Sequence, residues 1–324
     1  MKAIVRYRYG SPDVLELREV ARPAVTDQDV LVRVRAASLN ADDLEYLYGK
    51  SPFTRIATGL RKPRIHGLGV DVAGQVEAVG KSVTAFHAGD EVFGNMTVHG
   101  LGAYAEYVCA PASAFALKPG TLTFEQAATV PQSAVLALQG LRGKRKIRPG
   151  DQVLINGAGG NVGPFAVQIA KHLGAEVTGV YSAAKLDMVR SVGADHVIDY
   201  ARTDVVRSGQ PYDLILDVVA RRSMLEWRRV LKPGGAYVML GASTGLLLQG
   251  ALLGPLISIA GSRKTAVMWW WKPFQREDVA FLTDLIEAGH VAPVIDRRYE
   301  LSEVPEALRY LEGGQARGKI VITV

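Results

Sequence analysis

Short apolar runs, separated by glycine and proline, dominate the N-terminal part of the chain. Runs of strand length lie at residues 30–35, 74–80, 90–94 and 103–108. Runs of this size with turn residues between them are typical of all-β folds. We therefore expect an all-β, barrel-like unit over residues 1–121.

From about residue 122 the pattern changes to strands that alternate with helices. Thr123-Phe124-Glu125-Gln126 is a capping-box pattern and predicts the start of an alanine-rich helix. Repeated strand–helix units with apolar strands predict an α/β fold with a parallel, doubly wound sheet over residues 122–272. The compact apolar runs that predict its strands lie at 153–156, 176–180, 196–199, 214–217 and 236–240.

Two amphipathic helices and a strand end the chain. The first helix is expected from about residue 275 to residue 288, because its apolar positions recur at helical spacing and Gly289 follows as a stop. The second is expected over 302–313, and the closing strand over 319–324.

Composition excludes several classes of protein. The length of 324 residues suits about two domains, and 48% hydrophobic with 22% charged residues is ordinary for a globular chain. The net charge is +6, with one basic cluster at 142–148. A nucleic-acid-binding protein more often concentrates its charge in one stripe with aromatic residues. Nucleic acid is therefore not an expected partner, and anionic small molecules are favoured.

Cysteine usage and the N-terminal sequence indicate the compartment. Cys109 is the one cysteine, which excludes an internal disulfide and a cysteine-rich structural zinc site. It lies on an apparent β-segment, which favours a buried, inert thiol over a nucleophile. Because no signal-peptide pattern is visible, we expect a cytoplasmic protein.

The longest apolar stretch covers residues 246–260 and is interrupted by polar and turn-forming residues such as Gln249 and Pro255. It is shorter than the roughly 20 residues that span a bilayer, so no transmembrane segment is expected. The stretch is interpreted as core, or alternatively as a hydrophobic substrate port or a weak membrane-surface contact.

A glycine-rich turn gives the clearest indication of a ligand. The strand at 153–156 runs into Gly157-Ala158-Gly159-Gly160-Asn161-Val162-Gly163, and a helix follows. Such a turn lets the backbone approach a pyrophosphate at the positive end of a helix. Gly160 would permit the close approach, Gly163 would let the helix pack on the sheet, and Ala158 takes the place of the first glycine. A turn without a ligand is the alternative, but the agreement of strand, turn and helix favours dinucleotide binding by residues 158–163.

The second strand of this unit bears on which dinucleotide binds. NAD-binding proteins usually place Asp or Glu at its end to hold the ribose 2′-hydroxyl. The chain has no acid there, and Ser182 and Lys185 suit the 2′-phosphate of NADPH better. The alternative is that Lys185 is a solvated helix lysine, in which case NADH remains open. Tyr200 and Gly241 complete the predicted cofactor contacts.

Several motifs along the chain are shared with one family. They include Arg35-Ala36-Ala37-Ser38-Leu39-Asn40, Gly69-Val70-Asp71-Val72-Ala73-Gly74, Gly89-Asp90-Glu91-Val92-Phe93-Gly94, Leu231-Lys232-Pro233-Gly234-Gly235 and Gly318-Lys319-Ile320-Val321. From end to end the chain resembles the zinc-independent quinone oxidoreductase branch of the medium-chain dehydrogenase/reductase superfamily. The resemblance implies a GroES-like substrate domain over 1–121 completed by 273–324, and a Rossmann domain over 122–272. It also implies hydride transfer from NADPH to a quinone or an activated C=C bond, and a homodimer.

The zinc-dependent relatives provide a comparison of ligand positions. Their metal is held by a Cys three residues before an Asp and by a Gly-His-Glu motif, where this chain has Asn40 before Asp43 and Gly69-Val70-Asp71. An amide and an isopropyl group do not replace a thiolate and an imidazole. We expect no catalytic zinc, and we interpret His66, His87 and His99 as loop or core histidines.

Without a metal, hydrogen-bond donors must stabilise the negative charge that develops on the substrate oxygen. Tyr46 and Tyr48 are the candidate donors, and at most one of them should face the substrate because they lie two positions apart on a helix. Asn40 resembles a family asparagine near the nicotinamide, although it can instead stabilise a turn. Leu136 stands where relatives often have Thr, and Gln132 or Ser133 would compensate. The expected substrate is a small hydrophobic electrophile.

Two other functions stay open at this stage. One is a medium-chain alcohol dehydrogenase, against which the missing metal ligands count. The other is an NADPH-binding scaffold or sensor without turnover, because no obligatory proton donor is evident. Trp269-Trp270-Trp271 place rings on both faces of an apparent strand, so at least one ring is expected at another subunit or at the substrate.

Overall fold

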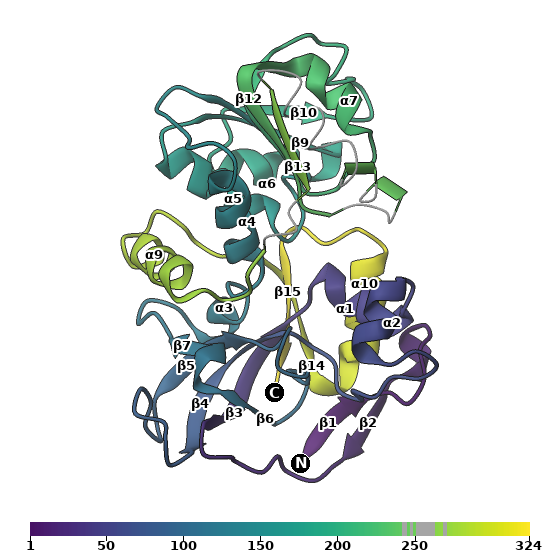
Figure 1. Ribbon diagram of the computed structural model, residues 1–324, viewed down its shortest axis with the longest axis vertical. Helices are drawn as coiled ribbons and strands as arrows, with labels where there is room; N and C mark the ends of the chain where they lie inside the picture. The colour runs from purple at the N-terminus through teal and green to yellow at the C-terminus, as the bar shows by residue number, and fades with distance from the viewer. Residues whose placement is uncertain (242–244, 247–248, 251–262, 268–270) are drawn as a thin grey trace. The chain divides into compact units, whose positions relative to one another are not determined.

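The computed structural model of the protein describes residues 1–241, 245–246, 249–250, 263–267 and 271–324 (Figure 1). The apolar segment at 246–260 and two of the three consecutive tryptophans therefore lie largely outside the described residues. The chain forms two compact units. The first contains residues 1–133, 273–287 and 293–324, and the second contains 134–272 and 288–292.

The first unit is built on β-strands from both ends of the chain. A seven-stranded sheet has the order β14-β15-β3-β4-β5-β7, with β6 paired to β3, and a separate ribbon joins β1 and β2. These strands are β1 (Lys2–Val5), β2 (Glu16–Glu19), β3 (Asp29–Ser38), β4 (Asp71–Val79), β5 (Glu91–Asn95), β6 (Tyr107–Pro111), β7 (Phe115–Leu117), β14 (Ile295–Glu300) and β15 (Lys319–Thr323). The C-terminal β15 pairs with β3, so the end of the chain completes the N-terminal sheet.

The first unit also contains helices, some of which contact this sheet or one another. They are α1 (Ala41–Tyr48), α2 (Pro52–Thr58), α3 (Phe124–Ala127), α9 (Arg276–Glu287) and α10 (Val304–Glu312). The buried side of the sheet is rich in Val, with Val30, Val32 and Val34 alternating along β3. Single 3-10 turns lie at Pro12–Val14, Ala112–Ala114 and Leu301–Glu303.

The second unit is a parallel six-stranded sheet in the order β10-β9-β8-β11-β12-β13. Its strands are β8 (Gln152–Asn156), β9 (Glu176–Tyr181), β10 (His196–Asp199), β11 (Tyr212–Asp217), β12 (Leu231–Met239) and β13 (Lys264–Val267). Its described helices include α4 (Ser133–Arg142), α5 (Gly163–His172), α6 (Leu186–Ser191) and α7 (Met224–Trp227), with 3-10 turns at Ala183–Lys185 and Arg228–Val230. The predicted Rossmann and GroES-like fold is confirmed.

The helix predicted from Thr123 is shorter than expected. Its capping box is present, since the Gln126 N–H donates to Thr123 Oγ1 at 3.2 Å and Gln126 Oε1 accepts from the Thr123 N–H at 3.0 Å. Only α3 follows, however, because Pro131 removes a backbone donor before α4 begins. The segment 122–133 thus lies with the first unit, against β3 and β4, and the boundary between the units falls at Ser133 rather than at residue 121.

Candidate functional site

The glycine-rich turn joins β8 to α5 at the carboxyl edge of the parallel sheet. The N–H groups of Gly157 and Ala158 both donate to the carbonyl of Val180 on β9, at 3.0 and 3.2 Å. This anchors the turn to the neighbouring strand. Gly157 has a φ of 94°, a left-handed conformation that favours glycine.

Gly163 and Gly160 are glycines for different physical reasons. A Cβ on Gly163 would lie 2.3 Å from the carbonyl oxygen of Ala158, so the start of α5 can approach the strand only as glycine. A Cβ on Gly160 would meet nothing closer than the carbonyl oxygen of Gly157 at 3.4 Å. The fold itself therefore leaves room at Gly160, and that room is where a ligand's pyrophosphate approaches in a dinucleotide turn. The residues present fit a dinucleotide.

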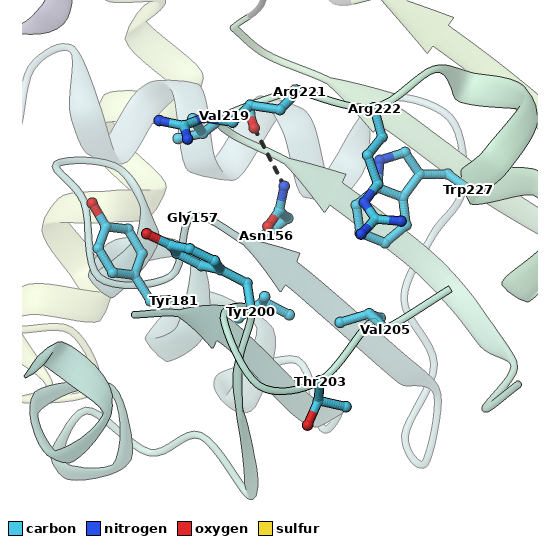
Figure 2. Close-up of a pocket in the computed structure, with 11 residues that line it drawn as sticks. Asn156, Gly157, Tyr181, Tyr200, Thr203, Val205, Val219, Arg221, Arg222 and Trp227 are labelled. Carbon is cyan, nitrogen blue, oxygen red and sulfur yellow. Dashed lines mark hydrogen bonds between the residues drawn. The ribbon is translucent and has the colours of Figure 1, made fainter. Parts of the chain in front are cut away.

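A cavity of about 250 Å³ opens beside this turn, entirely within the second unit (Figure 2). It is lined by the ends of β8 and β9 together with the loops after β10 and β11, including Asn156, Tyr181, Tyr200 and Arg221. Asn156 is held at its floor because Nδ2 donates to Asp217 Oδ1 at 2.7 Å. Of the predicted cofactor residues, Tyr200 lies in this cavity wall, and its N–H donates to the carbonyl of Tyr181 at 3.2 Å.

Ser182 and Lys185 lie on the turn that follows β9. The Ser182 hydroxyl forms no hydrogen bond with a described residue, whereas its carbonyl accepts from the Lys185 N–H at 3.0 Å. Lys185 is only 4% exposed, with Nζ 3.1 Å from the Tyr181 hydroxyl and 4.4 Å from the centre of its ring. The alternative interpretation of Lys185 as a solvated helix lysine is therefore wrong. Gly241 lies outside the cavity wall, where its carbonyl accepts from the Ala220 N–H at 2.9 Å.

Arg221 is a cavity residue that the sequence analysis missed. It is exposed, and among the described residues no acid pairs with it. Its neighbour Arg222 is instead paired with Asp204 at 3.0 Å. The positive charge of Arg221 lowers the pKa of the Tyr181 hydroxyl, although burial raises that pKa more. The sequence does contain a signal for it, because Arg221 and Arg222 follow the strand β11. The carboxyl ends of parallel strands lie at one edge of the sheet, where the glycine-rich turn also lies.

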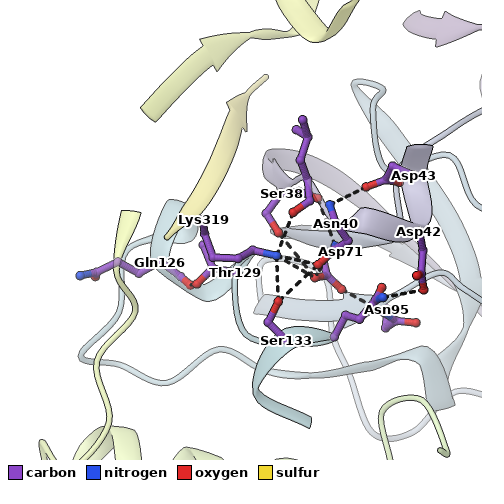
Figure 3. A network of polar contacts seen from close by, with 12 residues as sticks. Ser38, Asn40, Asp42, Asp43, Asp71, Asn95, Gln126, Thr129, Ser133 and Lys319 are labelled. Carbon is purple, nitrogen blue, oxygen red and sulfur yellow. Dashed lines mark hydrogen bonds and ion pairs between the residues drawn. The ribbon is translucent and has the colours of Figure 1, made fainter. Parts of the chain in front are cut away.

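A second polar site lies inside the first unit, around Asn40 at the start of α1 (Figure 3). Both amide atoms of Asn40 are bonded. Its Nδ2 donates to Asp71 Oδ2 at 2.9 Å, and its Oδ1 accepts from Lys319 Nζ at 2.7 Å and from Ser133 Oγ at 3.3 Å. Asn95 Nδ2 donates to the other Asp71 oxygen at 2.9 Å. Asn40 is thus the centre of a network of five buried residues from five separate segments.

Lys319 is the buried cation of this network and was not predicted as a site residue. Its Nζ also donates to the Leu39 carbonyl at 3.0 Å and to Ser133 Oγ at 3.1 Å, and lies 3.8 Å from Asp71 Oδ2. Burial lowers the pKa of Lys319 to about 8, while the nearby carboxylates oppose this effect. Burial likewise raises the pKa of Asp71.

Acidic residues of α1 surround this network. Asp43 accepts from the Asn40 N–H at 2.7 Å and from the Tyr104 hydroxyl at 2.8 Å, and burial raises its pKa to about 7. Asp42 accepts from Gln132 Nε2 at 2.7 Å. The other amide atom of Gln132, Oε1, is buried and accepts no hydrogen bond from any residue that the structure describes. A buried acceptor without a donor costs free energy, and an N–H of a bound ligand would remove that cost by donating to Gln132 Oε1.

The two candidate tyrosines of α1 are in different environments. Tyr46 is half-buried, and its hydroxyl forms no hydrogen bond with a described residue. Burial raises its pKa, and the neighbouring carboxylates Asp42 and Asp43 raise it further, so it remains a donor. Tyr48 lies at the surface and donates to both carboxylate oxygens of Glu312, at 2.9 and 3.0 Å. Tyr46 therefore has the available proton of the pair.

The positions that match zinc ligands are occupied by groups of another kind. Val70 is fully buried in the apolar core, and Asp71 is bonded to two amides. Within the described ranges, no three His, Cys, Asp or Glu side chains form a cluster that could hold a metal ion. His66 and His87 are exposed loop residues, and burial lowers the pKa of His99. Cys109 is half-buried rather than buried as expected, but burial still raises the pKa of its thiol to about 11, which suits an inert thiol.

Comparison with known proteins identifies the family. Residues 26–120 match the alcohol dehydrogenase GroES-like domain, and residues 192–322 match a zinc-binding dehydrogenase domain. A 2-methylene-furan-3-one reductase from Solanum lycopersicum is 33% identical over 99% of this chain and 79% of its own.

Solved structures agree with this assignment. The quinone oxidoreductase from Coxiella burnetii has a TM-score of 0.89 at 30% identity, covering 100% of this chain and 99% of that one. The Escherichia coli quinone oxidoreductase complexed with NADPH has a TM-score of 0.86 at 26% identity, with 100% of both chains covered. Fold and turn together define a nicotinamide-dependent oxidoreductase of two domains. The chain belongs to the medium-chain dehydrogenase/reductase superfamily, in its quinone oxidoreductase-like branch.

Proposed function

We propose that this protein is an NADPH-dependent oxidoreductase that transfers a hydride to a quinone or an α,β-unsaturated carbonyl, without a catalytic metal. The observation that carries the proposal is the β8–α5 turn, where a Cβ on Gly160 would meet no described atom closer than 3.4 Å and where the adjoining cavity contains Arg221, which pairs with no acid among the described residues. The relatives named above for enone and quinone reduction support the same reaction class.

The choice of NADPH rests on charge at the carboxyl ends of the strands. No acid follows β9, so no carboxylate is in place to hold a ribose 2′-hydroxyl. The free Ser182 hydroxyl and the Arg221 guanidinium supply a donor and a charge for a 2′-phosphate. Lys185 and Tyr181, which lie together, form the third element of this binding set. The E. coli neighbour with bound NADPH supports the assignment.

The chemistry of the donors supports a reaction without zinc. The family description that mentions zinc covers residues 192–322, whereas the positions that match zinc ligands are Asn40, Val70 and Asp71. None of these three supplies a thiolate or an imidazole, and Asp71 is already paired with Lys319.

The turn at residues 158–163, together with Ser182 and Arg221, would hold the dinucleotide, which would supply a hydride to the substrate carbon. Negative charge would develop on the carbonyl oxygen, and a proton from solvent would complete the reduction. The hydroxyl of Tyr46 donates a hydrogen bond to that oxygen, since its raised pKa keeps it protonated. Gln132 Oε1 accepts an N–H of the ligand. Asn40 holds Ser133 and Asp71 in place through its two amide atoms. Tyr48 plays no part because its hydroxyl already donates to the Glu312 carboxylate.

The first test follows oxidation of NADPH and of NADH with a benzoquinone, a phenanthrenequinone and a short enone, with and without EDTA. We expect EDTA-insensitive turnover that prefers NADPH. EDTA-sensitive oxidation of alcohols would instead identify an alcohol dehydrogenase. Tight NADPH binding without turnover on the whole panel would identify a scaffold or sensor. A cytoplasmic location and a homodimer stay predictions.

A further inference from the structure

Helix α2 packs with its polar side inward and its apolar side outward. Thr54 and Thr58 are 8% and 3% exposed, whereas Phe53 and Ile56 are 62% and 69% exposed. Leu60, just after the helix, is 65% exposed. An amphipathic helix of a globular protein normally shows the reverse arrangement.

Hydrogen bonds hold α2 in this orientation. Thr54 Oγ1 donates to Glu45 Oε1 at 2.9 Å, and the Thr58 hydroxyl lies 2.7 Å from the Tyr9 hydroxyl. Both contacts are made toward the interior of the first unit, where α2 lies beside α1 (Figure 1). Turning the apolar side inward would break these bonds, so Phe53, Ile56 and Leu60 face solvent as part of the folded state.

Basic residues surround this apolar face. The segment 46–70 contains no Asp or Glu, and residues 50–64 contain five cations, so this short stretch supplies +5 against a net charge of +6 for the whole chain. Arg55 is held by the carbonyls of Gly49 and Leu60. The remaining cations are exposed, and no ion pair joins them to an acid in the part of the chain that the structure describes: Lys50, Arg61, Lys62 and Arg64.

We propose that the protein binds to the surface of an anionic lipid bilayer through residues 50–64, which we call the 50–64 surface. Phe53, Ile56 and Leu60 enter the boundary between headgroups and acyl chains, and the four exposed cations contact the anionic headgroups. Bulky apolar side chains beside unpaired basic residues are the combination that interfacial helices use. A protein partner would have to bring an acidic rim and an apolar pocket together, whereas an anionic membrane presents both everywhere.

This surface contains no residue assigned above to cofactor or substrate, so binding and turnover are separable. It would let the enzyme act at the surface where apolar electrophiles accumulate. Binding should weaken as salt rises, because exposed charges are screened over about 10 Å at 0.1 M salt. Each Lys or Arg near an anionic surface strengthens binding several-fold, and three together change it on the order of 100-fold.

The test is co-sedimentation of the full chain with vesicles of phosphatidylcholine alone, or mixed with phosphatidylglycerol, at low and high salt. We expect binding to the anionic vesicles at low salt. The cation variant Arg61→Gln/Lys62→Gln/Arg64→Gln should bind on the order of 100-fold more weakly. Its matched control removes three exposed arginines elsewhere, Arg33→Gln/Arg35→Gln/Arg229→Gln, and should bind almost as the wild type does.

The apolar variant Phe53→Ser/Ile56→Ser/Leu60→Ser should also lose binding, while Val98→Ser/Leu117→Ser/Leu225→Ser should not. Circular dichroism and NADPH oxidation with a water-soluble quinone verify that each variant is folded and active. Equal binding to pure phosphatidylcholine, or equal loss in the variants and their controls, would overturn the proposal. So would concentration-dependent dimerisation that Phe53→Ser abolishes without vesicle binding, because the face would then belong to a second copy.

Discussion

Removal of the buried lysine charge tests how the network around Asn40 is held together. Lys319 is 1% exposed and Asp71 is fully buried, with 3.8 Å between Nζ and Oδ2. In Lys319→Met the aspartate keeps its two amide donors but loses its counter-charge. Breaking a buried pair from one side costs about 3–5 kcal/mol, so we expect a loss of stability of that size at neutral pH.

The pH dependence of this cost follows from the pKa of the lysine. Burial lowers that pKa from 10.5 to about 8, a difference that corresponds to roughly 3 kcal/mol. Between these two values the unfolded chain binds more protons than the folded chain, so the lysine's contribution to stability rises with pH. The destabilising cost of the buried charge is absent above pH 10.5, grows as the pH falls from 10.5 to about 8, and is complete below about 8. Relative to Lys319→Met, the wild type should therefore gain stability across this window.

The assay is urea denaturation of the wild type, Lys319→Met, Asp71→Asn and the double variant from pH 7 upward. All four tryptophans lie between residues 227 and 271, in the second unit, so circular dichroism is needed to follow the first unit. We expect the double variant to be more stable than the sum of the single losses indicates. Parallel pH profiles for the wild type and Lys319→Met, or strictly additive losses, would refute the reasoning.

Three further predictions concern the cofactor turn and the substrate. Arg221→Ala should raise KM for NADPH about 10- to 100-fold and leave KM for NADH nearly unchanged, as measured by steady-state kinetics. Gly163→Ala should destabilise the protein by about 1–3 kcal/mol, because its Cβ would meet a backbone carbonyl at 2.3 Å, whereas Gly160→Ala should keep the melting temperature and weaken NADPH binding in a fluorescence titration. Tyr46→Phe should lower kcat about 100-fold or more, while Tyr48→Phe, whose hydroxyl serves Glu312, should retain it; equal effects would exclude Tyr46 as the donor.

The elements that the sequence predicts well are those whose cause is local. The strands at 153–156 and 196–199 and the helix near 275–288 appear within two residues of their expected bounds, because periodicity and stop signals lie within each segment. Three expectations differ more: the strand expected at 103–108 lies at Tyr107–Pro111, the strand expected at 236–240 already begins at Leu231, and the helix expected from Thr123 is short. Its capping box formed as predicted, but Pro131 and contacts with β3 and β4 ended it after one turn.

The dinucleotide turn and the network around Asn40 also differ in how local their causes are. The dinucleotide turn consists of consecutive residues. The atoms that exclude a side chain at Gly163 belong only to Ala158 and Gly157, which lie in the same turn. The network around Asn40 joins five segments, from Ser38 to Lys319, and nothing near Lys319 in the sequence indicates that it is buried. A lysine at the start of a strand is ordinarily solvated.

The consequence concerns the catalytic role of Asn40. The family resemblance implies that its amide lies near the nicotinamide, but both amide atoms are already bonded to Asp71, Lys319 and Ser133. Asn40 begins α1, the helix that carries Tyr46, so the buried charge pair fixes the start of the element that presents the proposed donor. Of the positions that match zinc ligands, Asn40 and Asp71 are hydrogen-bonded to each other, whereas Val70 packs in the apolar core. We therefore expect Lys319→Met to reduce turnover through the placement of Tyr46 as well as through stability.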